Sequence, residues 1–397
     1  MKTILFDLTV AQPLGSKFHG AGAYTESVFL ALCKKADQVN LICIYNSCKY
    51  LNPLIKENCE RFNLKMQDVK GTSFYYIVKK ISPDVYFTAL PSEDRIVHVE
   101  NVRLITVCHD IRNIDCHFDP FYYEFAQNWK DWVFIFDSIF LRGMIARKNT
   151  LSNLNMFIGQ KNTDFITVSR HTKYHVLSLF PYLNQKKIPV FYSPMHHKNK
   201  PKITKDDCLP ESIIKNKYFL MDSGWRWMKN NLRAAIAIDQ VFSENQNLDF
   251  KVVITGIKSS KPYLSKLKNK NKFIFLDYVD DFIMNNLHEN AYCFVYPSLA
   301  EGFGYSPLKS MMYEVPVIAS SISSIPEVCG DAVLYTNPKS ITEIKNRVLQ
   351  ILNPKIYKEI KIKCLKRYND IAQKQKNDLK EFINYLVSNN DNSHLNK

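Results

Sequence analysis

The chain has 397 residues, of which 46% are hydrophobic and 23% charged, values that exclude a disordered, collagenous or disulfide-knot protein. At roughly 150 residues per domain, this length predicts two or three domains. The 53 lysines and arginines outnumber the 38 aspartates and glutamates and give a formal charge of +15, which favours an anionic partner.

Cysteine usage and the amino terminus both favour a cytoplasmic protein. The ten cysteines have irregular spacings without a Cys-x-x-Cys pair, in a chain too long to need disulfide bonds. The first residues, MKTILFDLTV, lack the features of a signal peptide and predict a buried strand. Charged residues interrupt the longest apolar stretch, residues 129–144, so we expect no transmembrane segment.

Short apolar runs alternate with helical stretches along the chain. The first half has such runs at residues 4–8, 40–45, 84–88, 103–108 and 164–169. The second half has them at residues 218–223, 250–255, 272–276, 291–296, 316–320 and 332–335. Alternation of this kind predicts parallel strands with crossover helices, and therefore an α/β fold of two doubly wound, Rossmann-like domains.

The alternation pauses at residues 193–217, which are rich in proline and lysine and lack apolar periodicity. We expect an interdomain linker there. It separates an N-terminal domain, residues 1–192, from a C-terminal domain, residues 218–370. Residues 341–387 have helical periodicity with no strand to follow, so we expect closing helices, with residues 371–397 as a C-terminal helix and tail.

Open α/β sheets bind ligands at the carboxyl ends of their strands, so the residues after each strand are candidates. After the first strand, residues 15–22 lead into a helix predicted at residues 23–35. Gly20 and Gly22 would let an anion approach the amino terminus of that helix. A turn that needs glycine only for a positive φ explains the same pattern equally well.

Two Cys-His pairs, Cys108-His109 and Cys116-His117, follow the fourth predicted strand. They suggest zinc, but their spacing matches no common zinc pattern, and a buried thiol at the end of an apolar run is ordinary. His109 is a better candidate as a donor to a bound sugar or phosphate. A purely structural histidine is the alternative.

In the second half, the segment SGWRWMKNN places two cations, Arg226 and Lys229, between a strand and a helix. The planar fork of arginine and the point charge of lysine suit the two phosphates of a diphosphate. We expect both side chains outside the core. A solvated basic turn is the alternative.

The strongest local signal is the segment PSLAEGFGYSPLK at residues 297–309. Glu301 follows the end of a strand, and Gly302 and Gly304 expose backbone at the start of a helix. Pro307 suits the first turn of that helix. The segment therefore predicts a phosphate site.

In this order the motifs resemble those of the retaining, nucleotide-sugar-dependent glycosyltransferases of family 4, or group 1. These enzymes have the GT-B fold, in which two Rossmann-like domains face a central cleft. The matching segments are residues 20–24, 107–110, 166–173, 224–230, 301–304 and 316–328. The last two segments, at their mutual spacing, are the most specific.

The resemblance implies roles for individual residues. Glu301 resembles the first glutamate of the family's Glu-x7-Glu motif, which contacts the donor sugar, and His109 resembles the histidine near that sugar. Arg226 and Lys229 resemble the diphosphate clamp, although Trp225 alters the usual spacing. The other donor-binding positions implied are Gly20 and Gly22 of the amino-domain loop, Gly304, Tyr305 and Ser306 at the phosphate, and Tyr278 and Val279 near the base.

Lys309 departs from the family pattern, in which a second glutamate holds the ribose hydroxyls. A lysine cannot accept hydrogen bonds from hydroxyls, so the ribose is held differently, the donor differs, or the domain has lost activity. Lys309 stays among the candidates for donor binding. The alternative function is a non-catalytic partner subunit that keeps the GT-B fold.

The resemblance implies transfer of a sugar from a nucleoside-diphosphate sugar to a saccharide or lipid-linked acceptor, in cell-surface polysaccharide or glycoconjugate synthesis. The N-terminal domain would bind the acceptor and the C-terminal domain the nucleotide sugar. Arg226, Lys229 and the helix after Gly304 would stabilise the leaving diphosphate. This scheme needs no metal or other cofactor, and the dispersed bases do not fit a nucleic-acid partner.

Residues 129–148 combine aromatic side chains with flanking bases. A helix that lies against an anionic membrane surface has this composition. The protein would then be peripheral on the cytoplasmic face of a membrane. A buried core helix with basic ends is the alternative.

Overall fold

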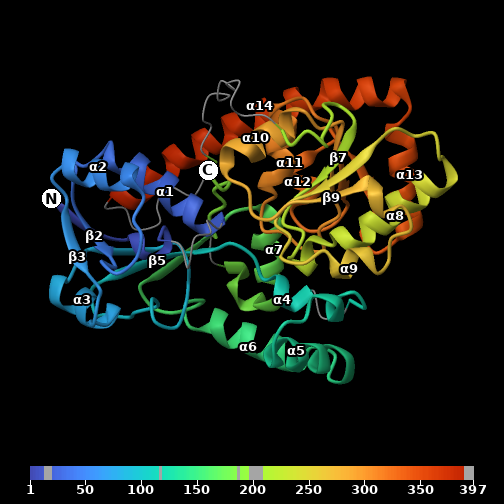
Figure 1. Ribbon diagram of the computed structural model, residues 1–397. Helices are drawn as coiled ribbons and strands as arrows, with labels where there is room; N and C mark the ends of the chain where they lie inside the picture. Colours follow the sequence, from blue (N-terminus) through green and yellow to red (C-terminus); the bar gives the residue numbers. More distant parts are fainter. Residues whose placement is uncertain (13–19, 116–118, 186–187, 196–208, 389–397) are drawn as a thin grey trace. The chain divides into compact units, whose positions relative to one another are not determined.

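The computed structural model describes residues 1–12, 20–115, 119–185, 188–195 and 209–388. The expected positions outside these ranges are residues 15–19 of the first glycine loop, Cys116, His117 and residues 196–208 of the linker. The chain forms two compact units (Figure 1). The first unit comprises residues 1–111, 148–197 and 372–397, and the second comprises residues 112–147 and 198–371.

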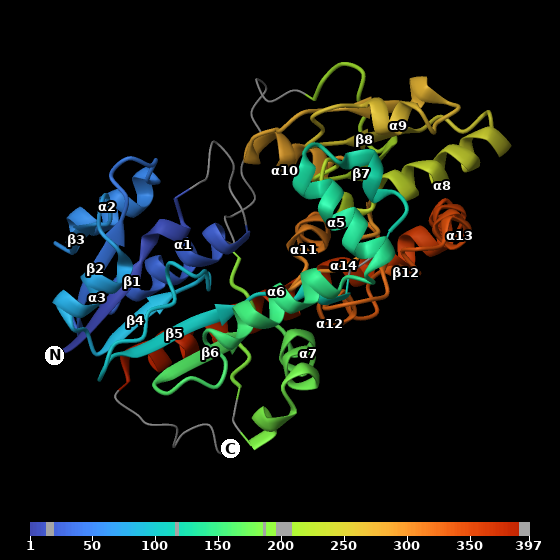
Figure 2. The same ribbon diagram turned by 90° about the horizontal axis from the view of Figure 1, so that it is seen from below.

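A six-stranded parallel sheet with the order β3-β2-β1-β4-β5-β6 forms the centre of the first unit (Figure 2). Its strands are β1 (Lys2–Asp7), β2 (Val39–Tyr45), β3 (Lys65–Asp68), β4 (Val85–Thr88), β5 (Arg103–Cys108) and β6 (Thr163–Thr167). Ile4 of β1 lies opposite Leu41 of β2 on one side and Val85 of β4 on the other. The strand order reverses between β1 and β4, which is where sheets of this kind bind ligands.

Helices follow the strands of this unit in sequence. They are η1 (Leu8–Val10), α1 (Gly20–Cys33), α2 (Pro53–Arg61), α3 (Phe74–Ile81), α7 (Arg170–Leu179) and η3 (Pro181–Gln185), with most of α6 (Met144–Asn155). Side-chain oxygens cap several of them: Ser73 accepts a hydrogen bond from the amide of Tyr76 at the start of α3. The buried face of α3 packs through Ile77 and Val78 into a core that includes Leu5 of β1.

The second unit repeats the same strand order, β9-β8-β7-β10-β11-β12, in another parallel sheet. Its strands are β7 (Tyr218–Met221), β8 (Lys251–Ile254), β9 (Phe273–Phe275), β10 (Cys293–Tyr296), β11 (Val317–Ser320) and β12 (Leu334–Thr336). The order reverses between β7 and β10. Gly224 follows β7 where a Cβ atom would overlap the side chains of Ile254 and Ile257, so a larger residue would force them to move.

The helices of the second unit begin with α4 (Arg112–Asp115), η2 (Tyr122–Phe125) and α5 (Trp129–Phe140). After β7 come η4 (Trp227–Lys229), α8 (Asn231–Glu244), α9 (Lys261–Leu264), η5 (Lys270–Lys272), α10 (Asp281–Glu289), α11 (Tyr305–Met312), α12 (Ile325–Cys329) and α13 (Ile341–Ile351). The long α14 (Pro354–Val387) begins in this unit and ends in the first. There Phe382 packs on Phe87 of β4, with ring centroids 5.7 Å apart.

The predicted fold class, α/β with two doubly wound domains, is confirmed, and each run predicted as a strand overlaps an observed strand. Strand β3 was not predicted, because its sequence KMQD is polar and it pairs only with β2 at the edge of the sheet. The closing helices are α13 and α14. Among the described residues, no helix combines the length and apolarity needed to cross a membrane.

Candidate active site

The site in the second unit is centred on a buried ion pair between Lys229 and Glu301. Lys229 ends η4, which follows β7, and Glu301 follows β10, so the two residues meet where the strand order reverses. Lys229 Nζ lies 3.0 Å from Glu301 Oε1, and the two side chains are 10% and 12% exposed. The topology of the sheet therefore brings Lys229 and Glu301 together although they are 72 residues apart in the sequence.

Glu301 is held in its ionised form. Burial favours the neutral acid, but the charges of Lys229 and Arg112 and a hydrogen bond from Ser298 outweigh it and lower the pKa of Glu301 to about 2. Ser298 Oγ donates to Glu301 Oε1 over 2.6 Å. Glu301 Oε2 accepts no hydrogen bond from the described residues and can bind a hydroxyl of a ligand.

The Lys229 ammonium is fixed by two partners and keeps a third donor. It donates to the phenol oxygen of Tyr296 over 2.7 Å as well as to Glu301. The ammonium also lies 4.6 Å from the centroid of the Tyr296 ring. Because an ammonium has three donors, one remains for an anionic ligand.

Backbone contacts lock the loops that carry this pair. The amide of Leu299 donates to the carbonyl of Met228 over 2.8 Å, which ties the loop after β10 to η4. Asn230 Nδ2 donates to the carbonyl of Pro297 over 2.9 Å. Ser324 Oγ donates to the carbonyl of Glu301 over 2.8 Å. The pair is therefore preorganised, because its geometry does not wait for a ligand.

Arg226 and Lys229 occupy different environments. We expected both side chains outside the core. This is correct for Arg226, which is exposed, and wrong for Lys229, which is buried because its ammonium binds Glu301 and Tyr296. Arg226 makes no ion pair with any carboxylate of the described residues. Its charge still acts on the buried Tyr296 hydroxyl. Burial raises the pKa of Tyr296 well above its usual value, and the charge of Arg226 opposes this rise. Arg226 is thus near the pair and free to bind an anion.

Gly304, Tyr305 and Ser306 form the amino terminus of α11, as expected from the sequence. Gly304 has a φ of 109°, a conformation that other residues rarely adopt, and the space around its missing side chain is open. No side chain of the described residues caps this helix end. The amides at this helix end, three to five residues after Glu301, are therefore candidates for binding an anion.

Three further polar atoms near the carboxyl edge of this sheet were not predicted. Asp222 Oδ1 after β7, Trp225 Nε1 in the next turn and Thr255 Oγ1 after β8 are buried without a hydrogen-bond partner among the described residues. Buried polar groups normally have partners, so these atoms mark this edge of the sheet as one where polar groups are left unpaired. Arg112 was also missed, since its effect on Glu301 depends on a fold contact that no motif encodes.

Lys309 lies on α11 beside a buried histidine of α10. Burial and, after it, the charge of Lys309 lower the pKa of His288 well below its usual value. His288 is fully buried, and its Nδ1 atom lies 2.7 Å from Ser310 Oγ. Lys309 is half-buried, and its charge acts on His288.

Tyr278 and Val279, expected near the base of the donor, lie in the segment between β9 and α10. This segment is anchored where the amide of Gly256 donates to the carbonyl of Asp277 over 3.2 Å. The Tyr278 ring is 48% exposed. A partly exposed ring at this place is a candidate for stacking on a planar ligand.

The remaining predicted site residues belong to the first unit. His109 follows β5, its Nε2 atom lies 2.8 Å from the carbonyl oxygen of Ala89, and its ring meets Tyr24 edge-on at 5.1 Å. Gly20 and Gly22 lie in the first turn of α1, three residues earlier than the predicted helix start. Neither has the positive φ of the alternative explanation, which is therefore wrong.

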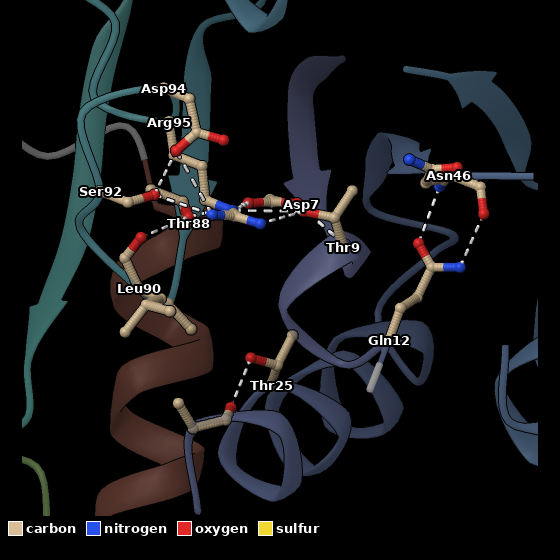
Figure 3. A network of polar contacts seen from close by, with 12 residues as sticks. Asp7, Thr9, Gln12, Thr25, Asn46, Thr88, Leu90, Ser92, Asp94 and Arg95 are labelled. Atoms are coloured by element: carbon tan, nitrogen blue, oxygen red, sulfur yellow. Dashed lines mark hydrogen bonds and ion pairs between the residues drawn. The ribbon is translucent and has the colours of Figure 1, made fainter. Parts of the chain in front are cut away.

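The first unit has its own polar network at the carboxyl ends of β1 and β4 (Figure 3). The fully buried Asp7 accepts hydrogen bonds from the Thr9 amide over 2.9 Å and from Thr88 Oγ1 over 2.9 Å. Arg95 Nε lies 3.2 Å from Asp7 Oδ2. Burial raises the pKa of Asp7, and Arg95 and these hydrogen bonds oppose the rise.

A cavity of about 610 Å³ opens next to this network. Arg95 and Thr9 form one wall, Asn46 and Lys49 follow β2, and Tyr75 begins α3. The Tyr75 ring is about half exposed. A cavity of this size, with donors, acceptors and an aromatic face, can hold a small polar ligand.

Comparisons with known proteins bear on both units. Residues 204–389 match the family described as glycosyl transferases group 1. The O-antigen chain mannosyltransferase RfbU of Salmonella typhimurium is 30% identical over 177 residues, which are 44% of this chain and 46% of that protein. The chain thus spans about half the length of this relative.

Solved structures resemble almost the entire chain. A glycosyltransferase from Rickettsia africae has a TM-score of 0.63 at 16% identity and covers 98% of this chain and 99% of its own. HepE of Anabaena, solved in complex with UDP-glucose, has a TM-score of 0.58 at 13% identity and covers 96% and 99%. At these identities the likeness establishes the fold, and the predicted GT-B architecture is confirmed.

Proposed function

We propose that the chain, whose residues 204–389 match the group 1 glycosyl transferases, transfers a sugar from a nucleoside-diphosphate sugar to a saccharide or lipid-linked acceptor. The observation that carries this proposal is the preorganised Lys229–Glu301 pair beside the uncapped amino terminus of α11. A carboxylate, two cations and the amino terminus of a helix together match a sugar joined to a diphosphate.

The residues divide the donor between them. Glu301 Oε2 accepts hydrogen bonds from sugar hydroxyls, because Oε1 is already occupied by Lys229 and Ser298. The exposed Arg226, the third donor of Lys229 and the amides of Tyr305 and Ser306 face the diphosphate. The uncommitted atoms of Asp222 and Thr255 lie at the same sheet edge and support a polar ligand there.

Stabilisation of the leaving group supplies most of the rate. As the bond between the anomeric carbon and the phosphate oxygen breaks, negative charge grows on the diphosphate, where Arg226 and the α11 amides can neutralise it. No protein nucleophile is needed, and we propose that the anomeric configuration is retained. The scheme uses no metal or other cofactor. His109 would act from the first unit, near the sugar.

For the acceptor we propose the cavity of the first unit. Tyr75 offers an aromatic face, and Asn46, Lys49 and Thr72 offer donors and acceptors for hydroxyl groups. A saccharide needs this combination of apolar and hydrogen-bonding surface. Since a relative is named an O-antigen chain mannosyltransferase, we propose mannosyl transfer in cell-surface polysaccharide synthesis, on the cytoplasmic side of a membrane.

The test is a binding and turnover screen of the full chain with GDP-mannose, UDP-glucose and related donors, each with and without divalent metal. We expect one donor to bind and to be hydrolysed slowly without acceptor. Glu301→Gln should lose most turnover, while Glu244→Gln, which changes an exposed glutamate of α8, should not. NMR of the product then reports the anomeric configuration.

The outcomes separate the proposals. Binding without turnover in the presence of acceptors would support a non-catalytic partner subunit instead of an enzyme. Failure to bind any nucleoside-diphosphate sugar would overturn the donor site. With a donor identified, Tyr75→Ala and Lys49→Ala should raise the KM for the acceptor and leave donor hydrolysis unchanged. An unchanged acceptor KM would remove the cavity from the reaction.

A further inference from the structure

Helix α5 has its apolar side toward solvent. Its large exposed side chains are Trp129, Trp132, Val133, Phe136, Ile139 and Phe140, and Trp129 and Phe140 are 70% and 69% exposed. The spacings of three and four residues place these side chains along one face of the helix. The alternative of a buried core helix is therefore wrong. An amphipathic surface helix normally has the opposite arrangement.

Three polar residues of α5, Asp131, Asp137 and Ser138, are held by the protein rather than exposed. Asp131 Oδ2 accepts hydrogen bonds from the amides of Gln127 and Asn128 over 2.8 and 3.1 Å, in a capping box at the helix start. Asp137 and Ser138 are buried. Phe134 packs inward against Tyr122, with ring centroids 5.2 Å apart. These contacts fix the rotation of the helix and keep its apolar face outward.

The corner between α5 and α6 is equally well fixed (Figure 2). The buried Asp137 carboxylate accepts hydrogen bonds from the amides of Ile145 and Ala146, over 3.0 and 2.9 Å. At the start of α6, Met144 and Ile145 are exposed as well. We call the docking face the exposed apolar side chains of α5 together with Met144 and Ile145.

Cationic residues accompany the docking face. Lys130, Arg142, Arg147 and Lys148 are exposed, whereas the two acids of residues 129–148, Asp131 and Asp137, are used in the caps described above. The charge available to a partner is therefore positive. Aromatic side chains with adjacent bases match the interface of a bilayer, where rings enter the headgroup region and cations meet anionic lipids.

We propose that the docking face binds the surface of a bilayer that contains anionic lipid. The helix axis lies in the plane of the interface, Trp132, Phe136 and Phe140 enter it, and Arg142 and Arg147 contact lipid phosphates. The helix is amphipathic and carries charged residues, as expected of an interfacial segment. The inference goes beyond the proposed transfer reaction, because it needs neither donor nor acceptor and can fail or succeed without it.

The test is sedimentation of the full chain with vesicles of phosphatidylcholine, with and without phosphatidylglycerol, at low and high salt. We expect binding only with the anionic lipid, reduced by salt. Phe136→Ser combined with Phe140→Ser should lower the partition coefficient at least roughly tenfold. Arg142→Gln combined with Arg147→Gln should lower it by roughly tenfold at low salt and by less at high salt.

Matched controls exclude a general effect of exposed residues. Ile362→Ser removes an exposed apolar side chain of α14, and Lys358→Gln combined with Lys361→Gln removes two exposed charges of the same helix. Neither control should change vesicle binding. Circular dichroism verifies that every variant is folded.

Three outcomes would overturn the proposal. One is binding that ignores both lipid charge and the α5 substitutions. Another is loss of binding that is equal in the α14 controls. The third is a stable dimer in solution that Phe136→Ser with Phe140→Ser dissociates, because the docking face would then be covered by a second copy of the chain.

Discussion

The two sheets have the same strand order, and each carries a carboxylate and a cation where that order reverses. In the first unit the pair is Asp7 and Arg95, and in the second it is Glu301 and Lys229. The Asp7 side chain is 0% exposed, whereas that of Glu301 is 12% exposed. Burial raises the pKa of Asp7, while neighbouring charges overcome burial and lower that of Glu301.

The difference lies in how many acceptor positions the protein itself uses. Asp7 accepts at both oxygens, from Thr9, Thr88 and Arg95, so nothing remains for a ligand. Glu301 accepts at one oxygen only. The point where the strand order reverses thus holds a structural contact in one unit and a candidate binding group in the other, and the unused acceptor distinguishes the two carboxylates.

The largest expected effect is on the structural pair. Asp7→Asn leaves Arg95, which is 16% exposed, with only the exposed Asp94 as a counter-charge, and we expect a loss of roughly 3 to 5 kcal/mol in the unfolding free energy of the first unit. All four tryptophans lie in the second unit. Circular dichroism follows the unfolding of both units, and tryptophan fluorescence follows that of the second unit only. A transition seen by circular dichroism but not by fluorescence therefore belongs to the first unit.

The control for this prediction is Asp94→Asn, since Asp94 contacts the same arginine at 3.5 Å but is 63% exposed. An exposed ion pair contributes little, so we expect a change of at most about 1 kcal/mol. Equal losses for Asp7→Asn and Asp94→Asn would contradict the structural role given to Asp7.

The second prediction separates binding from structure within the second unit. Arg226→Ala should lower the transfer rate about 10² to 10³-fold, as for the loss of one preorganised donor, with no loss of stability. Lys229→Ala should lower the rate similarly but also destabilise the unit, because Glu301 keeps a buried charge. Paired measurements of rate and of denaturation test this. Wild-type rates in both variants would contradict the proposal that Arg226 and Lys229 bind the diphosphate.

The third prediction uses pH. The pKa of Glu301 is about 2 in the folded chain against 4.5 ordinarily, so its ionised form stabilises the second unit above pH 4.5. This stabilisation, about 3 kcal/mol, is lost as pH falls from about 4.5 to 2. Glu301→Gln should flatten the pH dependence of tryptophan-detected unfolding in this range.

Asp7 affects the pH dependence of stability in the opposite direction, because its pKa is raised in the folded chain. Its ionisation opposes folding as pH rises above the ordinary pKa of an aspartate. The first unit should therefore not share the acid sensitivity that Glu301 gives the second. A second unit whose stability is as pH-dependent in Glu301→Gln as in wild type would contradict the role of Lys229 and Arg112.

The sequence predicted the sheets well, because apolar runs and helical periods are local. It also singled out Glu301, Arg226, Lys229 and Gly304 as candidates, since they lie in loops directly after strands. It could not find the burial of Lys229, the contact with Arg112 or the Asp7–Arg95 pair, because these depend on segments between 72 and 189 residues apart being brought together. Edge strand β3 was not predicted because its polar sequence lacks the apolar run by which the other strands were recognised.

The outward face of α5 shows the same limit. Its alternation of apolar and polar residues is consistent with either a core helix or a surface helix. Only the contacts of Asp131, Asp137 and Phe134 determine which side is inward. The periodicity of the sequence shows that a helix has an apolar and a polar face. The packing of the helix decides which of these faces is exposed to solvent.

The smallest expected effect concerns Lys309, which lies on the same helix as the phosphate amides but beside His288. If its ammonium contacts the donor, Lys309→Glu changes donor affinity by more than roughly tenfold, since a hydrogen bond to a charged group contributes about 1.5 to 3 kcal/mol. Titration of both proteins with the best donor measures this. Lys339→Glu, an exposed charge reversal in the same unit, should leave affinity unchanged.

The histidine provides a second readout that does not depend on the donor. Lys309→Glu replaces the positive charge beside His288 with a negative one, so the pKa of His288 should rise, although burial still holds it below the usual value. NMR titration of the imidazole follows this change. A rise in the His288 pKa with an unchanged donor dissociation constant would leave Lys309 at the α10–α11 contact and exclude it from the donor site, whereas changes in both would join Lys309 to the site that Glu301 and Lys229 define.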